Sequence, residues 1–97
     1  MATYVTLIKF TEKGSKSIKD TTKRAADFKT SAKKMGIEVK ESYWCMGAYD
    51  GVLIFEAPED ETATAGMLSL RSQDNVTTQT MRSYTAAEMS KILGKGS

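Results

Sequence analysis

Four stretches of this sequence are predicted to be strands from the pattern of their apolar and polar positions. They cover residues 3–10, 37–46, 51–57 and 76–84. The first and third carry large apolar residues on both faces, which is typical of strands in the centre of a sheet. The second and fourth alternate with polar residues, which favours the edges of the sheet.

A spacing of three, four and seven residues between apolar positions predicts a helix over residues 15–35. Its stripe consists of Ile18, Ala25, Phe28, Ala32 and Met35. We expect Ser15 or Ser17 to cap its start, and Gly36 to end it in the left-handed conformation. The preceding TEKGS, residues 11–15, is expected to be a break rather than a helix.

Two further helices are predicted after the third strand. Residues 58–73 begin with a proline and three acids, which the positive end of a helix dipole favours. Residues 85–94 begin with Thr85 and Glu88, the spacing of a capping box. The chain reads as one domain over residues 1–97, with a frayed tail expected over 93–97.

The order strand, helix, strand, strand, helix, strand predicts an α+β fold, the ferredoxin-like βαββαβ antiparallel sheet with an added C-terminal helix. Two helices cover one face of such a sheet. The other face would expose the apolar residues of the two central strands to water. We therefore expect a symmetric homodimer through this sheet face. The alternative is that the C-terminal helix folds over the face instead.

Composition narrows the range of functions. The net charge of +2 is too small to indicate nucleic acid as a partner, and the basic excess near Lys13–Lys34 reads as a solvated helix face. The chain has no histidine, which excludes Ser-His-Asp and Cys-His catalysis, so we expect neither metal nor cofactor. A single cysteine, no apolar stretch long enough for a membrane and no signal-like start favour a cytoplasmic protein without membrane contact.

The stretch GAYDG, residues 47–51, is the main candidate for chemistry. Glycine and aspartate favour a tight hairpin turn between the second and third strands, which would explain the motif without any ligand. Alternatively, Tyr49 and Asp50 form a polar pair at the mouth of a pocket between sheet and helices. Tyr43 and Trp44 are candidate ligand contacts at the same place, although aromatic residues in strands more often pack in a core or an interface.

Other candidates are weaker. Cys45 is expected to be a small apolar group rather than a nucleophile. The lysines and Arg24 near the start of the first helix could form an anion site, but a solvated face explains them as well. The third strand, GVLIFEA, is mainly aliphatic and has no basic residue, unlike the K/R-G-F/Y-rich strand of an RNA-recognition motif, so RNA binding is not expected.

Almost the whole chain resembles the GYD-domain family of small bacterial and archaeal proteins. The resemblance covers residues 3–93 and is carried by YWCMGAYDGVLIFEAPED, with Gly47, Tyr49 and Asp50 in the Gly-x-Tyr-Asp motif and residues 57–60 as Ala-Pro-Glu-Asp. Thr22 stands where the family often has proline. The resemblance implies a ferredoxin-like protomer of the dimeric α+β barrel type, and it implies no particular reaction.

Three functions remain open from the sequence. The first is a homodimeric small-ligand-binding or accessory protein, with Tyr49 and Asp50 near the rim of its pocket. The second is a cofactor-independent enzyme, similar to a monooxygenase or isomerase, acting on a small aromatic or carbonyl metabolite with catalytic residues that the sequence does not identify. The third is an assembly module without a pocket.

Overall fold

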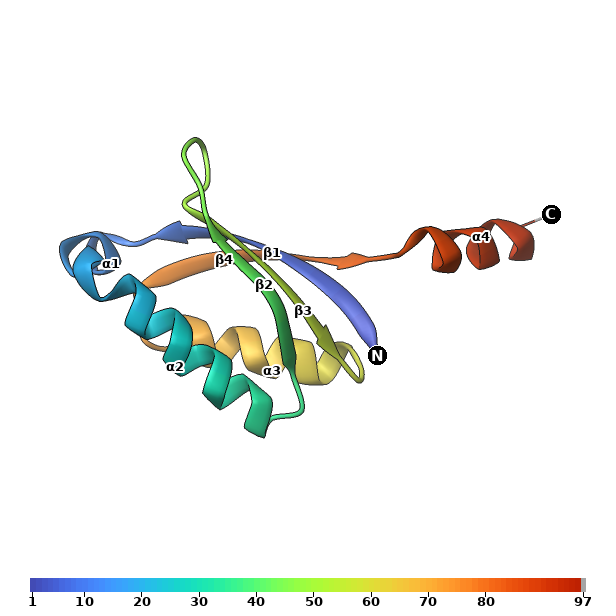
Figure 1. The fold of residues 1–97 in the computed structure, drawn as a ribbon, viewed down its shortest axis with the longest axis horizontal. Helices are drawn as coiled ribbons and strands as arrows, with labels where there is room; N and C mark the ends of the chain where they lie inside the picture. Colours follow the sequence, from blue (N-terminus) through green and yellow to red (C-terminus); the bar gives the residue numbers. More distant parts are fainter. Residues whose placement is uncertain (97) are drawn as a thin grey trace.

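The computed structural model describes residues 1–96 and contains one antiparallel sheet with two long helices on one of its faces (Figure 1). This confirms the predicted α+β class. The elements in chain order are β1 (Ala2–Phe10), α1 (Glu12–Lys16), a 3-10 turn η1 (Ile18–Asp20), α2 (Thr21–Lys34), β2 (Glu38–Trp44), β3 (Gly51–Ala57), α3 (Asp60–Arg71), β4 (Val76–Ser83) and α4 (Ala86–Lys95).

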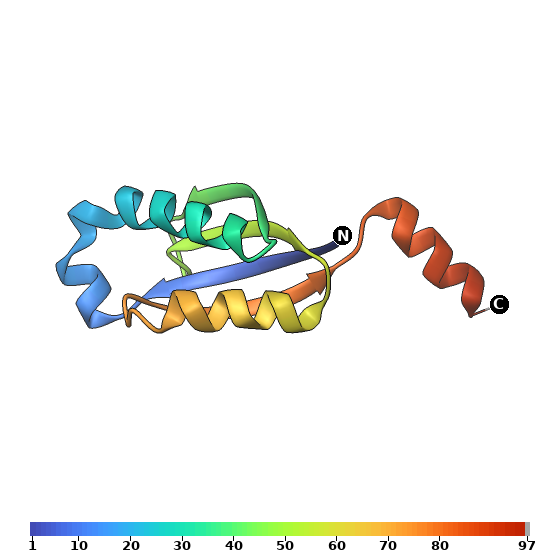
Figure 2. The same ribbon diagram turned by 90° about the horizontal axis from the view of Figure 1, so that it is seen from below.

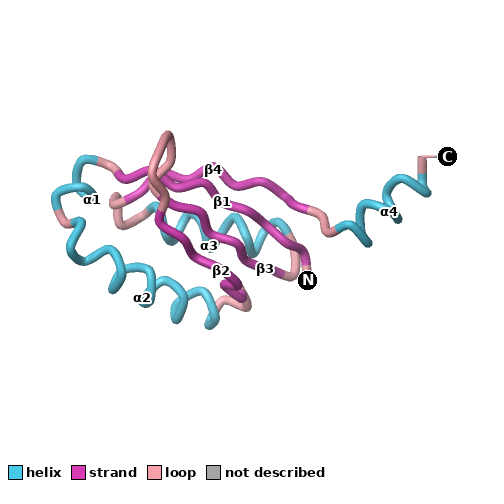
Figure 3. The backbone as a smooth tube through the Cα atoms, turned by 45° about the horizontal axis from the view of Figure 1, so that its top comes forward, coloured by secondary structure: helices cyan, strands magenta, loops and turns pink. Residues whose placement is uncertain are grey.

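The strands lie side by side in the order β2-β3-β1-β4 (Figure 3). The predicted central position of β1 and β3 is therefore confirmed, as are the edge positions of β2 and β4. All three pairings are antiparallel, and Leu7 in β1 lies opposite both Val52 and Gln79. The edge strand β2 is interrupted by a bulge between Val39 and Glu41, a common way to make an edge unsuitable for pairing with another strand.

The hydrophobic core lies between the sheet and the helices α2 and α3, which run side by side over the same face (Figure 2). Alternate residues of β1 and β3 point into it, as the period of two requires. Gly66 lets α3 approach closely, because a Cβ there would lie 2.3 Å from Cδ1 of Ile37. The buried apolar residues are Tyr4, Ala32, Ile37, Leu53, Phe55, Ala57, Ala63 and Met67.

The opposite face of the sheet, called the open face below, is not covered by any described helix (Figure 1). Its apolar side chains are half-buried or exposed; they are Val5, Leu7, Val52, Ile54 and Met81. The C-terminal helix does not fold over this face; α4 projects beyond the end of β4 (Figure 1). The chain is accordingly elongated, with a radius of gyration of 14.6 Å, where about 12.5 Å is typical of this length.

The start of the first helix differs from the prediction. The expected break over residues 11–15 is wrong, because α1 begins at Glu12. The hydroxyl of Thr11 accepts a hydrogen bond from the N–H of Gly14 at 3.1 Å, and the N–H of Thr11 donates to the carbonyl of Asn75 at 3.1 Å. Ser17 makes no side-chain cap, and the long helix α2 starts only at Thr21.

Other helix ends agree with the sequence. Gly36 follows α2 with a φ of 87°, the left-handed conformation predicted for it. The capping box of Thr85 and Glu88 at the start of α4 is present in both directions. The expected tail overlaps the last residues of α4, and its final residue, 97, lies outside the described residues. No helix within residues 1–96 combines the length and apolar character that a membrane crossing requires.

Candidate functional site

A cavity of about 270 Å³ lies between α2 and the sheet, at the end of the sheet where the loop 45–50 joins β2 to β3. Its walls are mainly apolar because the inward faces of α2, β1 and β3 meet there. The apolar lining includes Ile8, Phe10, Ala25, Phe28, Val39, Leu53, Leu70 and Val76. The polar lining includes Thr21, Arg24, Asp50 and Asn75.

Asp50 lines this cavity and also ties three strands together. Its N–H donates to the carbonyl of Ile8 in β1, and its carbonyl accepts from the N–H of Cys45 after β2, both at 2.8 Å. Its carboxylate oxygen Oδ2 accepts from the N–H of Phe10 at 2.8 Å. Asp50 is therefore a structural residue of the loop, and it is also one of the few charged groups in the cavity wall.

The side chain of Tyr49 points away from the cavity, toward the open face of the sheet. Its hydroxyl donates to Oε1 of Gln79 at 3.0 Å, and the ammonium of Lys9 lies 6.0 Å from its ring centroid. Gln79 is opposite Leu7 in the sheet, so this contact lies on the open face. The polar pair of Tyr49 and Asp50 that the sequence suggested does not form, because neighbouring residues at the base of the loop face opposite sides of the sheet.

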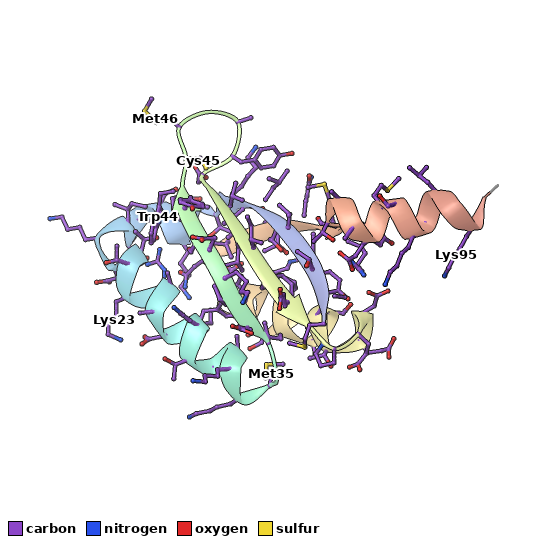
Figure 4. All side chains as sticks on the ribbon, turned by 45° about the vertical axis from the view of Figure 1, so that its right-hand side comes forward. Lys23, Met35, Trp44, Cys45, Met46 and Lys95 are labelled. Carbon is purple, nitrogen blue, oxygen red and sulfur yellow. The ribbon has the colours of Figure 1, made fainter. Side chains whose placement is uncertain are left out.

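Trp44 and Tyr43 are neighbours in β2 and point to opposite faces of the sheet. Trp44, opposite Gly51, lines the cavity, whereas the side chain of Tyr43, opposite Val52, lies on the open face. The indole N–H of Trp44 donates to the hydroxyl of Thr21 at 3.0 Å, and 47% of this residue is exposed, so it forms part of the cavity's mouth (Figure 4). The hydroxyl of Tyr43 donates to Glu41 at 3.0 Å. That bond to a carboxylate, and then its negative charge, raise the pKa of the Tyr43 phenol.

Arg24 is a cavity residue whose role the sequence did not reveal. Its guanidinium donates to the carbonyl of Ser17 at 2.7 Å and lies 3.5 Å from the carbonyl of Gly14. The side chain therefore holds α1 and η1 against the start of α2. In the sequence it was one of several basic residues, and only its position on the same helical face as Thr21 and Phe28 could have distinguished it.

A second, more polar groove of about 420 Å³ lies between α3 and β4. The phenol of Tyr4 donates to Oδ1 of Asp60 at 2.6 Å, and the guanidinium of Arg82 lies 5.6 Å from the ring centroid of Tyr4. The pKa of Tyr4 is raised to about 12, mainly because the phenol is buried and to a smaller extent because it donates to Asp60. The phenol is thus neutral at physiological pH and acts as a donor.

Three comparisons relate this chain to known proteins. The family model described as the GYD domain matches residues 4–93. A curated relative from Thermus thermophilus, described as "Glutamine synthetase and cystathionine beta-lyase binding protein", is 27% identical over 90 residues. The aligned region covers 92% of this chain and 95% of that relative.

A solved structure described as "crystal structure of FFRP-DM1" is similar to this chain in fold. The TM-score is 0.58 at 21% sequence identity, and the match covers 87% of this chain and 100% of the other. At this level of identity the likeness concerns the arrangement of sheet and helices, and it says nothing about ligands or partners.

Proposed function

We propose that this chain, which belongs to the GYD domain family, is a homodimeric binding protein that holds a small, mostly apolar molecule between α2 and the sheet. The cavity of about 270 Å³ is the observation that carries the proposal. It has room for about nine groups of the size of a water molecule. That is slightly below the usual range for drug-sized ligands, so the ligand is small.

The lining gives the chemical class of this ligand. Phe28, Leu53 and the ring of Trp44 favour an apolar or aromatic body. Asp50 uses Oδ2 to accept from Phe10, while Oδ1 has no hydrogen-bond partner among residues 1–96. A ligand with an amine or hydroxyl group could donate to that oxygen. The expected ligand is therefore a compact apolar molecule with one donor group.

Binding is favoured over catalysis because the polar side chains of the cavity already hold the fold. The guanidinium of Arg24 is bonded to Ser17, and the indole N–H of Trp44 is bonded to Thr21. A catalytic group must be within reach of a substrate and poised for proton transfer. These groups would have to break structural bonds before they could act in that way.

The open face supports the dimer. Val5, Leu7 and Ile54 are apolar and only half-buried, and a second sheet stacked about 10 Å away would remove them from water. The strand order β2-β3-β1-β4 is the order expected of a ferredoxin-like protomer. We therefore propose a dimer of the α+β barrel type, formed through this face.

The relative from Thermus favours a second function. Its description names two enzymes that it binds, so an accessory role toward an enzyme is the corresponding candidate for this chain. In that case the ligand would act as a signal that the dimer reports to its partner enzyme. Pull-down from the source organism, followed by mass spectrometry with and without the cavity variants below, tests this role.

Two substitutions at Asp50 test the cavity. Asp50→Asn keeps an oxygen that can accept from Phe10 but removes the charge, so we expect weaker ligand binding and little loss of stability. Asp50→Ala removes both the accepting oxygen and the charge, and it should lower the free energy of unfolding by about 1–3 kcal/mol. Trp44 is the only tryptophan, and its fluorescence reports binding from a panel of small aromatic amines and alcohols. A loss of stability in Asp50→Asn as large as in Asp50→Ala would make the carboxylate purely structural.

A cavity-filling variant completes the test. Ala25 lines the cavity, whereas Ala65 is exposed on α3, so Ala25→Leu should abolish binding and Ala65→Leu should leave it unchanged. Native mass spectrometry of protein purified from its own host would identify the ligand. If nothing copurifies and no panel compound changes the Trp44 fluorescence, the ligand-binding proposal fails. A mass near 10.6 kDa by light scattering would exclude the dimer.

A further inference from the structure

Two apolar elements project from the body at opposite ends of the sheet. One is α4, on which Met89, Ile92 and Leu93 are exposed at a spacing that places them on one side of the helix. The other is the loop 45–50, whose tip residue Met46 is fully exposed (Figures 1 and 4). Exposed apolar residues at the ends of projecting elements indicate that something packs against them.

The strand pairing fixes the positions of these elements. Thr3 at the start of β1 lies opposite Ser83, the residue from which the chain continues to α4. Ile8 near the end of β1 lies opposite Gly51, and its carbonyl is bonded to Asp50 at the base of the loop. The nine residues of β1 span about 30 Å. The loop and α4 of one chain therefore cannot touch each other.

The directions in which they project differ. The loop rises from the sheet on the open side, away from α2 and α3, and α4 continues beyond the end of β4 roughly in line with that strand (Figures 1 and 3). The bond from Tyr49 to Gln79 fixes the base of the loop on the open side. The loop of one copy thus reaches toward the layer that a second sheet would occupy.

The size of the sheet indicates that both elements belong to the interface. Four strands of seven to nine residues give a footprint of roughly 500 Å². A stable interface buries about 800 Å² on each partner. The flat area of the sheet is smaller than this figure, and contacts made by the ten-residue helix α4 and the six-residue loop would add to the buried surface.

A two-fold axis between facing sheets lies in the plane of the interface, and its direction in that plane decides which ends of the two copies meet. An axis along the strands brings both loops to the same end, where they rise from opposite sheets into the same gap. The loop leaves the β2-β3 edge of the sheet and α4 continues from the β4 edge, so the two lie at opposite corners. An axis inclined to the strands, perpendicular to the line that joins these two corners, places the loop of each copy at the α4 corner of the other. In that arrangement the loop meets a helix that lies in the partner's layer, and both contacts form twice.

We propose that the dimer is clasped at both ends, with the loop 45–50 of each copy packed on the apolar side of α4 of the other. The occupant of both surfaces is thus a second copy of this chain. The inference rests on the sheet-to-sheet dimer proposed above. Met46, between Cys45 and the small residues Gly47 and Ala48, would insert beside Met89 and Ile92.

Cysteine cross-linking of the full chain tests the clasp. Cys45 is exposed and is the only cysteine. A disulfide requires Cα atoms within about 7 Å. Met89→Cys should therefore give, under mild oxidation, a disulfide from Cys45 to the introduced thiol of the other chain, and the 10.6 kDa band should shift to a two-chain band on a non-reducing gel. Met89 is itself 43% exposed, so the substitution should not disturb folding.

The matched controls are Lys91→Cys, on the charged side of α4, and Met89→Cys combined with Cys45→Ser; neither should cross-link. A cross-link between the two Cys45 thiols of the wild type would show the axis along the strands and overturn the clasp. A two-chain mass by light scattering without any cross-link in Met89→Cys would overturn the clasp but leave the dimer. A single-chain mass would overturn both.

Discussion

Phe55 in the body and Ile92 in α4 are both large apolar residues of the same chain, yet Phe55 is 0% exposed and Ile92 is 39% exposed. The ring of Phe55 stacks on Tyr4 at 5.2 Å between sheet and helices. No residue of α4 is buried, and the capping box at its start is a local stabilising feature. The body can therefore fold by burial within one chain, whereas a helix of ten residues without packing is marginal in water.

The largest expected difference between the two regions concerns core packing. Phe55→Ala should lower the free energy of unfolding by about 3–5 kcal/mol, because it removes a completely buried ring and leaves a cavity. Ile92→Ala should change it by less than about 0.5 kcal/mol. Urea denaturation at concentrations where light scattering gives a single chain measures both. A similar loss in the two variants would show that α4 packs on its own body.

Replacing a glycine by alanine should lower stability in the body and raise it in α4. A Cβ on Gly14 would lie 2.0 Å from the carbonyl oxygen of Asn75, so Gly14→Ala should destabilise the body by about 1–3 kcal/mol. A Cβ on Gly94 in α4 would meet nothing within 4 Å. Gly94→Ala should therefore raise the helicity of α4, by up to about 1 kcal/mol of helix stability. Thermal unfolding tests the first variant and circular dichroism the second; equal effects would refute the contrast.

The pH dependence of stability should come partly from Tyr4 in the body. Its pKa is about 12 in the folded chain and about 10 in the unfolded chain. The folded state thus holds the phenolic proton more tightly, and this stabilisation is complete below pH 10 and is lost as the pH rises toward 12. Urea titrations from pH 8 to 11 should show a smaller decline for Tyr4→Phe than for the wild type. Parallel curves would rule out this contribution.

An effect confined to one helix is expected at the start of α4. Thr85→Ala removes the cap on the N–H of Glu88 and should cost about 1 kcal/mol of helix stability. The loss should stay within α4 and leave the unfolding of the body unchanged. Amide hydrogen exchange resolves the two regions; faster exchange in β1 or β3 as well would mean that α4 and the body unfold together.

Periodicity was sufficient to predict most of the sheet. The predicted bounds of the third strand, residues 51–57, are the observed ones, because apolar side chains on both faces are typical of a central strand. The start of the first helix was predicted wrongly. Thr11 is fixed by the carbonyls of Asp74 and Asn75, more than 60 residues later in the chain, and local spacing holds no information about that contact.

The candidate site was predictable in location but not in composition. The motif around Asp50 pointed to the end of the sheet where the cavity lies, since turn residues follow from local conformational preferences. The separation of Tyr49 from Asp50 depends on the bonds of Asp50 to β1 and of Tyr49 to β4, and both are long-range. The roles of Trp44, Tyr43, Tyr49 and Asp50 in ligand binding remain predictions.

The three backbone and side-chain bonds of Asp50 have a mechanical consequence. Two of them, to Ile8 and Phe10, fix the base of the loop to β1, and the third joins that base to Cys45, while Met46 at the tip is fully exposed. The loop can therefore move only about its base at Asp50. Its tip should move on the nanosecond to microsecond timescale typical of loops, while its base stays fixed. A ligand that binds the Asp50 carboxylate in the cavity therefore contacts the residue about which the tip of the loop moves.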